Sequence, residues 1–377
     1  MSLVGVRLAL VGPLPPPAGG MANQTRQLAD KLAAEGVQVE LVQTNAPYRP
    51  AWLASVRGLR AVGRLLPFLC ALWRAAGRND LMHVMANSGW SWHLFAAPAI
   101  WIAHLRGCPV IVNYRGGEAA AFLERQAAVV CFTMRRAALL AVPSGFLQGV
   151  FARFGMRAEV LPNAVDVERF VPRGRAFRPD APHFIVTRNL EAIYDNETAL
   201  RAFALVRARC PDARLTLAGE GPELARLQAL AAALDVTAAV RFAGRLGREQ
   251  VAALYADADV MINPSRVDNT PNSVLESLAC GVPVVSTRVG GVPFLVEDGL
   301  TALLVPPADP DAMAQALLHL LDHPDTAATL RAEGLDAGLD VRTPGLGQFR
   351  RGRRQVAVDE IETAQAHADA AQLDQHV

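Results

Sequence analysis

Residues 265–285 read SRVDNTPNSVLESLACGVPVV and place two carboxylates, Asp268 and Glu276, around an expected helix start, with seven residues between them. Pro271 suits the first turn of a helix, and Gly281 suits its end. The N–H groups and the dipole at a helix start favour a phosphate, whereas carboxylates repel phosphate and accept hydrogen bonds from hydroxyl groups. A nucleotide sugar carries both kinds of group and is the ligand this pattern favours.

The residues just before this helix supply its expected cap. Asn269 or Thr270 is predicted to cap the helix through its side chain, because both types accept hydrogen bonds from first-turn N–H groups. Pro283 follows the helix and cannot continue it.

Apolar runs on both sides of the stretch predict parallel sheets. Runs rich in Val, Leu and Ile alternate with helix-like segments, as expected for strands buried on both faces. They fall at 183–188, 214–221, 240–244, 259–265, 282–287 and 301–306, and in the first half of the chain at 6–12, 37–43, 81–86, 109–114, 139–144 and 158–163. The predicted fold class is α/β, with two doubly wound, Rossmann-like domains that face each other across a cleft.

A proline-rich stretch separates the two halves. FVPRGRAFRPDAPH, residues 170–183, has three prolines and no periodicity. We therefore expect an N-terminal, acceptor-side domain at 1–170, a linker at 171–183 and a C-terminal, nucleotide-sugar-binding domain at 184–335. Residues 336–377 are polar and Ala-rich, and are expected to form an atypical, loosely packed tail.

Polar residues and glycines follow the predicted strands of the second half. Arg188, Gly219, Arg245 and residues 265–270 each come where a strand ends. Because parallel strands end at the same edge of a sheet, these residues are predicted to share one ligand site. The alternative is that they only form turns, which are commonly rich in glycine and polar residues.

The second half of the chain resembles the retaining glycosyltransferases of family 4, which have the GT-B fold. The resemblance rests on LTLAGEGPELARLQALAAAL (215–234), VRFAGRLGREQVAALYADADVMINPSR (240–266), DNTPNSVLESLACGVPVVSTRVGGVPFLVEDG (268–299) and ALLVPPADPDAMAQAL (302–317), and on VPSGFLQGVFARFG (142–155) in the first half. It implies that Glu276 binds the ribose hydroxyls and that the backbone near Asn269 and Thr270 holds the diphosphate. Asp268 stands where the family has a glutamate that contacts the donor sugar.

The resemblance also assigns the cations of the site. Arg188 matches the arginine that binds the diphosphate, but the lysine that usually follows is absent from RNLEAIYDNE, and Lys31 is the only lysine of the chain. Arg266 or Arg288 is therefore expected to supply a second positive charge near the leaving phosphate.

The first half contributes further candidates. Gly19 and Gly20 follow the first strand, where glycines allow close approach of a ligand, and the family places such a loop across from the diphosphate. Arg115 stands near the position of a histidine of the family, and Arg115 and Glu118 are candidate contacts to donor or acceptor.

Composition narrows the remaining classes of protein. The net charge is +1 and no basic stripe with aromatic residues occurs, which argues against a nucleic-acid partner. Five scattered cysteines without CxxC spacing indicate neither a disulfide framework nor a zinc site, and fit a cytoplasmic protein. Asp257 and Asp259 are expected to cap the strand that follows them, so no metal and no cofactor are expected.

Two segments bear on membranes. Residues 86–105 carry no formal charge, but their polar residues and the flanking strands favour a buried helix over a transmembrane span. Residues 52–78 contain five arginines, two tryptophans and no acidic residue, with Arg57, Arg60 and Arg64 on one helical face. This pattern is typical of a helix that lies on the inner face of an anionic membrane, and equally of a core helix with a solvated basic face.

The predicted function is transfer of a sugar from a nucleoside-diphosphate sugar to an acceptor hydroxyl, with retention of configuration. The acceptor is a glycan, a lipid-linked compound or a small molecule, and the predicted catalytic residues are Asp268, Arg188, Arg115 and Glu118. The alternatives are a non-catalytic nucleotide-sugar-binding or scaffold protein, and a UDP-sugar epimerase of the same fold.

Overall fold

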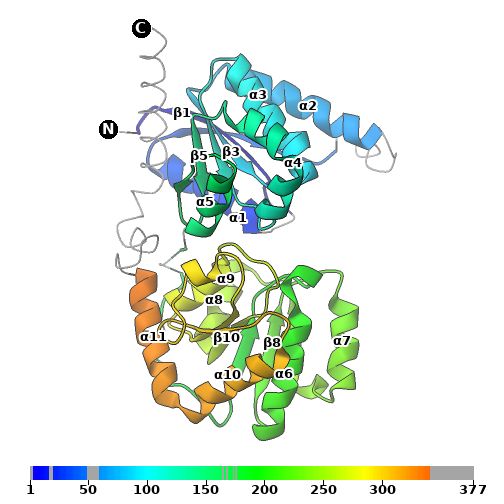
Figure 1. Ribbon diagram of the computed structural model, residues 1–377, viewed down its shortest axis with the longest axis vertical. Helices are drawn as coiled ribbons and strands as arrows, with labels where there is room; N and C mark the ends of the chain where they lie inside the picture. Colours follow the sequence, from blue (N-terminus) through cyan, green and yellow to red (C-terminus); the bar gives the residue numbers. More distant parts are fainter. Residues whose placement is uncertain are drawn as a thin grey trace. The chain divides into compact units, whose positions relative to one another are not determined.

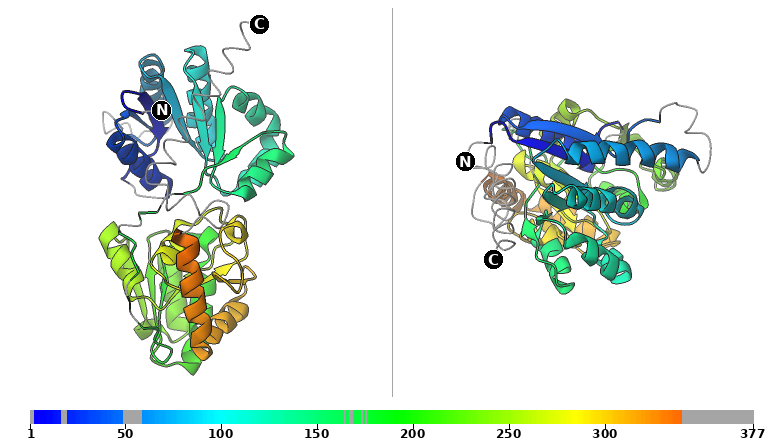
Figure 2. Two further views of the ribbon diagram at one scale, coloured as in Figure 1. Left: turned by 90° about the vertical axis from the view of Figure 1, so that its left-hand side faces the viewer. Right: turned by 90° about the horizontal axis from the view of Figure 1, so that it is seen from above.

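The computed structural model describes residues 3–16, 20–48, 59–163, 165–166, 169–172, 174 and 176–339 (Figure 1). They form two compact units, the first of which ends at Asn163. Each unit contains a six-stranded sheet with helices on both faces (Figure 2). The predicted α/β class with two doubly wound domains is confirmed. From residue 340 onward, the predicted tail lies outside the described residues.

The N-terminal unit has the strand order β2-β1-β3-β4-β5-β6, and its strand pairs are parallel. The strands are β1 (Arg7–Gly12), β2 (Gln38–Gln43), β3 (Leu81–Ala86), β4 (Val110–Tyr114), β5 (Leu139–Val142) and β6 (Glu159–Val160). The helices are α1 (Gly20–Ala34), α2 (Leu59–Ala76), η2 (Trp92–Ala96), α3 (Ala97–Leu105), α4 (Ala119–Met134) and α5 (Gly145–Arg153). Alternate residues of β1 enter different core clusters: Val11 packs with Leu72 of α2, and Leu8 packs with Leu32 of α1.

The C-terminal unit has the strand order β12-β11-β10-β7-β8-β9, again with parallel pairs. Its strands are β7 (His183–Val186), β8 (Arg214–Ala218), β9 (Val240–Gly244), β10 (Val260–Asn263), β11 (Val284–Thr287) and β12 (Leu303–Val305). Its helices are η3 (Ala192–Tyr194), α6 (Asn196–Arg209), α7 (Leu224–Ala233), η4 (Thr237–Ala239), α8 (Arg248–Asp257), α9 (Asn272–Ala279), η5 (Val292–Phe294), α10 (Pro310–Asp322) and α11 (Pro324–Leu339). Phe184 of β7 packs with Phe203 of α6, while Ile185 packs on the other face with Tyr255 of α8 and Leu275 of α9.

The strand order of the C-terminal unit reverses between β7 and β10. The chain runs outward from β7 to β9 on one side, then returns to β10 on the other side of β7. Doubly wound sheets bind ligands in the crevice beyond the carboxyl ends of the strands at such a reversal. Arg188 follows β7 and Asp268 follows β10, so the topology brings the two predicted site residues to the same crevice.

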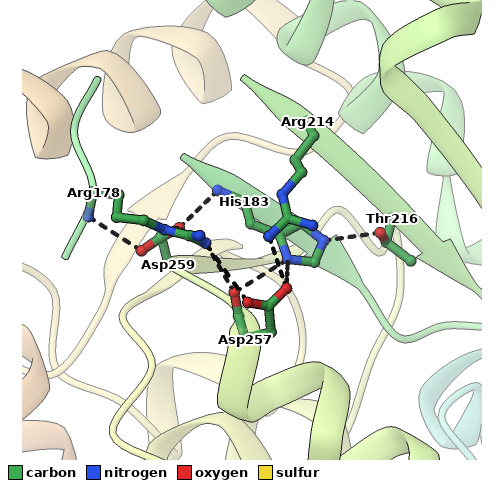
Figure 3. A network of polar contacts seen from close by, with 6 residues as sticks. All are labelled: Arg178, His183, Arg214, Thr216, Asp257 and Asp259. Atoms are coloured by element: carbon green, nitrogen blue, oxygen red, sulfur yellow. Dashed lines mark hydrogen bonds and ion pairs between the residues drawn. The ribbon is translucent and has the colours of Figure 1, made fainter. Parts of the chain in front are cut away.

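A polar network holds the opposite, amino-terminal edge of this sheet (Figure 3). Asp259 accepts hydrogen bonds from the backbone N–H of His183 at 2.8 Å and from Arg178 Nη2 at 2.8 Å. Asp257 lies 3.1 Å from the His183 ring and 2.7 Å from Arg214 Nη2. These contacts go to Arg178 and to the first residues of β7 and β8, which begin at the same edge of the sheet as β10, the strand that the two carboxylates were expected to cap.

Residues 86–105 form η2 and α3 against the core, as predicted. Trp92, Ile100 and Ala103 are fully buried there. In the part of the chain that the structure describes, no helix has both the length and the apolar character needed to cross a membrane.

Candidate nucleotide-sugar site

The centre of the candidate site is an ion pair at the strand-order reversal. Arg188 Nη2 pairs with Asp268 Oδ2, and the two side chains are only 13% and 10% exposed. Asp268 is fixed further by Ser265, whose Oγ donates to Oδ2 at 3.2 Å, and by the backbone N–H of Asn269, which donates to Oδ1 at 2.9 Å. The guanidinium and the carboxylate are thus held in place at the end of β7 and β10.

Tyr194 completes the surroundings of Arg188. The Arg188 guanidinium lies over the Tyr194 ring, with 4.1 Å between Cζ and the ring centroid. Burial raises the pKa of Tyr194, so its hydroxyl stays neutral, while the ring face attracts the cation. Sequence reasoning missed this residue, although an aromatic residue in RNLEAIYDNE, where a lysine was sought, was the available signal.

The two arginines expected to replace the missing lysine are both paired with carboxylates. Arg266 Nε lies 2.9 Å from Asp195 Oδ2, and its backbone N–H donates to Ile193 O at 2.9 Å. Arg288 pairs with Asp298. Both arginine side chains remain more than half exposed. Arg266 is the one tied to the loop that carries Tyr194, and therefore to the surroundings of Arg188.

Glu276 lies within α9 and is half-buried. Burial raises its pKa from 4.5 to about 7, and a hydrogen bond from Tyr255 and the charges of Arg188 and Arg248 oppose that rise. A carboxyl group so enclosed is suited to accept hydrogen bonds from a neutral ligand group, such as a hydroxyl, that enters with its own donors.

The start of α9 differs from the expected one. The helix begins at Asn272 with Pro271 at the cap position, and the proline side chain makes no cap hydrogen bond. The predicted capping by Asn269 or Thr270 is wrong, because Pro271 occupies the cap position that either would need. Gly281 ends the helix in the left-handed region at φ 65°, as predicted.

Two buried donors of the described site lack a hydrogen-bond partner in the protein. They are Arg188 Nε and Ser273 Oγ, the second of which lies in the first turn of α9. Buried polar atoms are nearly always satisfied, and the exceptions gather at sites that a ligand completes. Both groups are hydrogen-bond donors, so phosphate oxygens are suitable acceptors for them.

Glycines allow the loops of the site to pack backbone against backbone. A Cβ at Gly219 would clash with the Arg188 carbonyl, and a Cβ at Gly290 or Gly291 would clash with the carbonyls of Asp268 and Asn269. Gly219, predicted to bind the donor, thus lies directly beneath the loop of Arg188. Side chains at these positions are excluded because the loops would have to move apart.

Arg245 and Thr270 are less closely tied to this centre. Arg245 is exposed after β9, which lies two strands from β7 in the sheet. Thr270 is half-buried, one residue before the α9 cap.

A second polar cluster lies at the carboxyl edge of the first sheet. Arg115 follows β4 and donates to Asn113 Oδ1 at 2.9 Å, to Gln24 Oε1 at 3.0 Å and to Asn163 Oδ1. Gln24 lies in the first half of α1, the helix that begins at Gly20. These contacts place the guanidinium between the end of β4, the first half of α1 and the segment that follows β6.

The other N-terminal candidates are more exposed. Glu118 is exposed at the cap position of α4 and makes no capping bond. Gly19 lies outside the described residues. Nearby His83 is buried in β3, and burial and the Arg115 charge lower its pKa to about 3, which keeps the imidazole neutral. Among the described residues, no three His, Cys, Asp or Glu side chains gather in a way that could hold a metal.

Family models match both halves of the chain. The model described as Glycosyltransferase Family 4 matches residues 18–169, and the one described as Glycosyl transferases group 1 matches residues 181–323. The two parallel sheets and these matches define a protein with the GT-B fold. Within that class, the chain belongs to the family 4 glycosyltransferases.

Two relatives show moderate sequence identity to this chain. A GDP-mannose-dependent alpha-(1-6)-phosphatidylinositol monomannoside mannosyltransferase of Mycolicibacterium smegmatis is 36% identical over 218 residues, which cover 52% of this chain and 57% of that protein. This chain therefore matches little more than half the length of that relative. A D-inositol 3-phosphate glycosyltransferase of Actinosynnema mirum is 29% identical over 357 residues, or 81% of this chain and 85% of that protein.

Solved structures share the fold. Sucrose-phosphate synthase from Thermosynechococcus elongatus superposes with a TM-score of 0.76 at 22% identity, covering 97% of this chain and all of that one. HepE from Anabaena, solved in complex with UDP, gives a TM-score of 0.72 at 15% identity, covering 96% of this chain and all of that one.

Proposed function

We propose that this protein transfers a glycosyl group from a nucleoside-diphosphate sugar to an acceptor hydroxyl with retention of configuration. The observation that carries the proposal is the combination of Arg188, Asp268 and Glu276 at the strand-order reversal, where one cation and two carboxylates match a diphosphate flanked by sugar hydroxyls. The structure of HepE with UDP supports a nucleotide ligand for this fold.

Each residue has a distinct role in the proposed reaction. Arg188 offers its unpartnered Nε to the diphosphate, Asp268 accepts from a hydroxyl of the donor sugar, and Glu276 accepts from the ribose hydroxyls. The bond from the anomeric carbon to the phosphate oxygen breaks as the acceptor oxygen bonds to the same face, and the acceptor proton passes to the leaving phosphate. The protein groups position the reactants and stabilise the charge of the leaving diphosphate.

The other candidate residues have auxiliary roles in the proposed reaction. Arg266 supplies a second positive charge near the leaving phosphate, and Arg115 and Glu118 contact donor or acceptor from the N-terminal unit. Neither a metal nor a cofactor takes part in the proposed reaction. The scaffold and epimerase alternatives are less well supported, because the named relatives are glycosyltransferases and mannosyltransferases.

A lipid-linked acceptor at the inner membrane face is the acceptor class that we favour. One relative is named for a phosphatidylinositol monomannoside substrate. In this chain, the outer faces of α2, α3 and α4 expose the apolar side chains of Leu66, Trp73, Leu105, Val129 and Phe132. Arginines stack on this surface, Arg106 over Trp73 at 4.9 Å and Arg136 over Trp101 at 3.8 Å. Aromatic rings with arginines suit an anionic lipid surface.

This surface differs from the predicted arginine face of residues 52–78. Arg64 is partly exposed, with its guanidinium over the Tyr48 ring at 4.3 Å and its Nε buried. Arg57 and the side chain of Arg60 lie outside the described residues. Binding of the protein to vesicles that contain anionic lipid tests this surface, and Phe132→Ser should weaken that binding. Phe294→Ser in the other unit is the control, because Phe294 is 57% exposed and Phe132 is 54% exposed.

Calorimetry with UDP, GDP, ADP and CMP tests the donor site. We expect one diphosphate to bind, and we expect Glu276→Ala to abolish that binding. Glu333→Ala, at an exposed acid on α11, is the matched control. If no nucleotide binds, or if the Glu276 variant binds equally well, the proposed site is wrong. Retention is tested separately, by NMR of the anomeric configuration of the product.

A further inference from the structure

A hydrogen-bonded network of buried polar side chains leads from β11 to Asp268. Ser286 Oγ donates to the Thr287 carbonyl at 3.3 Å and accepts from Asn263 Nδ2 at 2.9 Å. Ser265 Oγ lies 2.9 Å from Asn263 Oδ1 and 3.2 Å from Asp268 Oδ2. Ser286, Asn263 and Ser265 are all fully buried. The network therefore connects the interior of the sheet with a carboxylate of the candidate site.

Donor and acceptor roles in this network follow from its inner end. The Thr287 carbonyl only accepts, so Ser286 donates to it and must itself accept from the Asn263 amide nitrogen. This orientation turns Asn263 Oδ1 toward Ser265, whose one hydroxyl proton lies between that oxygen and Asp268 Oδ2. The bond to the carboxylate is charge-assisted and is the stronger of the two. Asn263 thus holds the rotamer from which Ser265 reaches Asp268.

The contacts of Asp268 leave one of its two oxygens open to a ligand. Oδ2 accepts from Arg188 Nη2 and from Ser265 Oγ, whereas Oδ1 accepts from the backbone N–H of Asn269. Each oxygen of a carboxylate has two acceptor positions, so the second position of Oδ1 has no donor among the residues that the structure describes. A hydroxyl group of a ligand suits that position.

We propose that Asn263 and Ser265 are positioning residues of the donor site, which hold Asp268 so that Oδ1 accepts from a hydroxyl of the donor sugar. This role rests on the proposed function of Asp268 and adds two residues to it. Neither residue touches the donor, because both are fully buried. The backbone of Ser265 is also anchored to β11, since Thr287 Oγ1 donates to the Ser265 carbonyl at 2.6 Å.

The alternative is that the network only joins β10 to β11, because Asn263 and Ser286 stand opposite each other in the register of these strands. A purely structural role would lower stability and would affect all ligands of the site alike. A positioning role affects the sugar-binding oxygen alone. Loss of the network should then weaken the binding of nucleotide sugars and spare free nucleoside diphosphates, which lack the donor sugar.

Calorimetry that compares UDP with UDP-glucose, and GDP with GDP-mannose, separates the two roles. We expect Ser265→Ala to weaken binding of the nucleotide sugar about fivefold, as for the loss of one hydrogen bond, and to leave the affinity for the matching diphosphate within about twofold of wild type. Asn263→Ala should act in the same direction. Equal weakening of both ligands, or an unchanged affinity for the nucleotide sugar, would overturn the positioning role.

Ser277→Ala is the matched control for the serine variant. It removes another fully buried serine hydroxyl of the same unit, which donates to the Val282 carbonyl at 3.0 Å, and it should leave the affinity ratio unchanged. If Asn263→Ala does not fold, Ser286→Ala takes its place, because it removes the acceptor that orients the Asn263 amide. Ser286→Ala should weaken nucleotide-sugar binding by a smaller amount, and no change there would overturn the role of Asn263.

A ligand-free readout keeps this proposal separate from the proposed function. The Asn269 N–H has Asp268 Oδ1 as its acceptor, so a carboxylate that turns away leaves this amide open to exchange. Hydrogen exchange of the Asn269 amide, followed by NMR without nucleotide, should be about threefold faster in Ser265→Ala and unchanged in Ser277→Ala. Failure of the wild type to bind any nucleotide sugar would count against the proposed function, whereas unchanged exchange of this amide in Ser265→Ala would overturn the positioning role.

Discussion

Replacing Glu276 by Gln should stabilise the C-terminal unit at alkaline pH while weakening nucleotide binding. Burial raises the Glu276 pKa from 4.5 to about 7. One pKa unit corresponds to about 1.4 kcal/mol, so this rise changes the free energy of unfolding by at most roughly 3 kcal/mol between low and high pH. The figure is an upper value because Glu276 is half-buried.

The sign follows from proton linkage. Because the pKa is raised in the folded state, the folded protein binds more protons than the unfolded chain between pH 4.5 and about 7. The stabilisation is fully present below the lower of these values and is lost as the pH rises through the upper one. Gln resembles the neutral acid and does not titrate, so the difference between variant and wild type should be small at pH 4.5 and reach up to roughly 3 kcal/mol above pH 8.

The assay must follow the C-terminal unit alone. All five tryptophans lie within the first 101 residues, so tryptophan fluorescence reports on the N-terminal unit. Hydrogen–deuterium exchange of β7, β10 and α9 peptides at pH 5, 7 and 8.5, with Glu333→Gln as the control, gives the local free energy of opening. A difference between Glu276→Gln and wild type that does not change with pH, or that has the opposite sign, would refute the reasoning.

Three further predictions concern the rest of the unit. Gly291→Ala should weaken nucleotide-diphosphate binding at least tenfold in calorimetry, because the added Cβ displaces the Asn269 carbonyl, whereas alanine at exposed Gly247, where the nearest atom is 3.5 Å away, should not. Asp259→Ala should lower the free energy of unfolding of the C-terminal unit by about 3–5 kcal/mol, because Arg178 and the His183 N–H lose a buried carboxylate. Urea titrations with hydrogen–deuterium exchange as the readout measure this change. Tyr194→Leu should weaken diphosphate binding a fewfold through loss of the contact beneath Arg188, with the largest loss at low salt; equal loss for CMP would contradict this reasoning.

The strands could be predicted from the sequence because they are buried on both faces. The runs Leu81–Ala86 and Leu139–Val142 are apolar nearly throughout, because burial on both faces of the sheet favours apolar residues at consecutive positions. The pairing of Arg188 with Asp268 could also be predicted in outline, since both follow strands and the reversal of strand order brings those strands together.

The sequence did not reveal contacts between residues far apart in the chain. Tyr255 has the pattern of one more aromatic residue of a core, but its hydroxyl forms a hydrogen bond with Thr187, which is 68 residues away. Asp259 likewise acts on Arg178, 81 residues away. Hydrophobic periodicity says which way a side chain points but not which polar atom it meets, so such partners are set by the tertiary fold.

The cluster around α9 combines features that weaken an isolated fold. A carboxyl group is enclosed enough to raise its pKa, Arg188 Nε and Ser273 Oγ are buried without protein partners, and Gly290 is held at φ 50° against the Asp268 backbone. The buried carboxyl group and the two unpartnered donors each cost stability, and they lie on α9 and on the loop after β7. Sites evolved for binding keep such groups because a ligand satisfies them, whereas selection for stability alone removes them. A pure scaffold role does not require buried polar groups without partners, whereas a diphosphate offers acceptors to the two donors and its sugar hydroxyls offer donors to the carboxyl group, which is why the donor site is the better explanation.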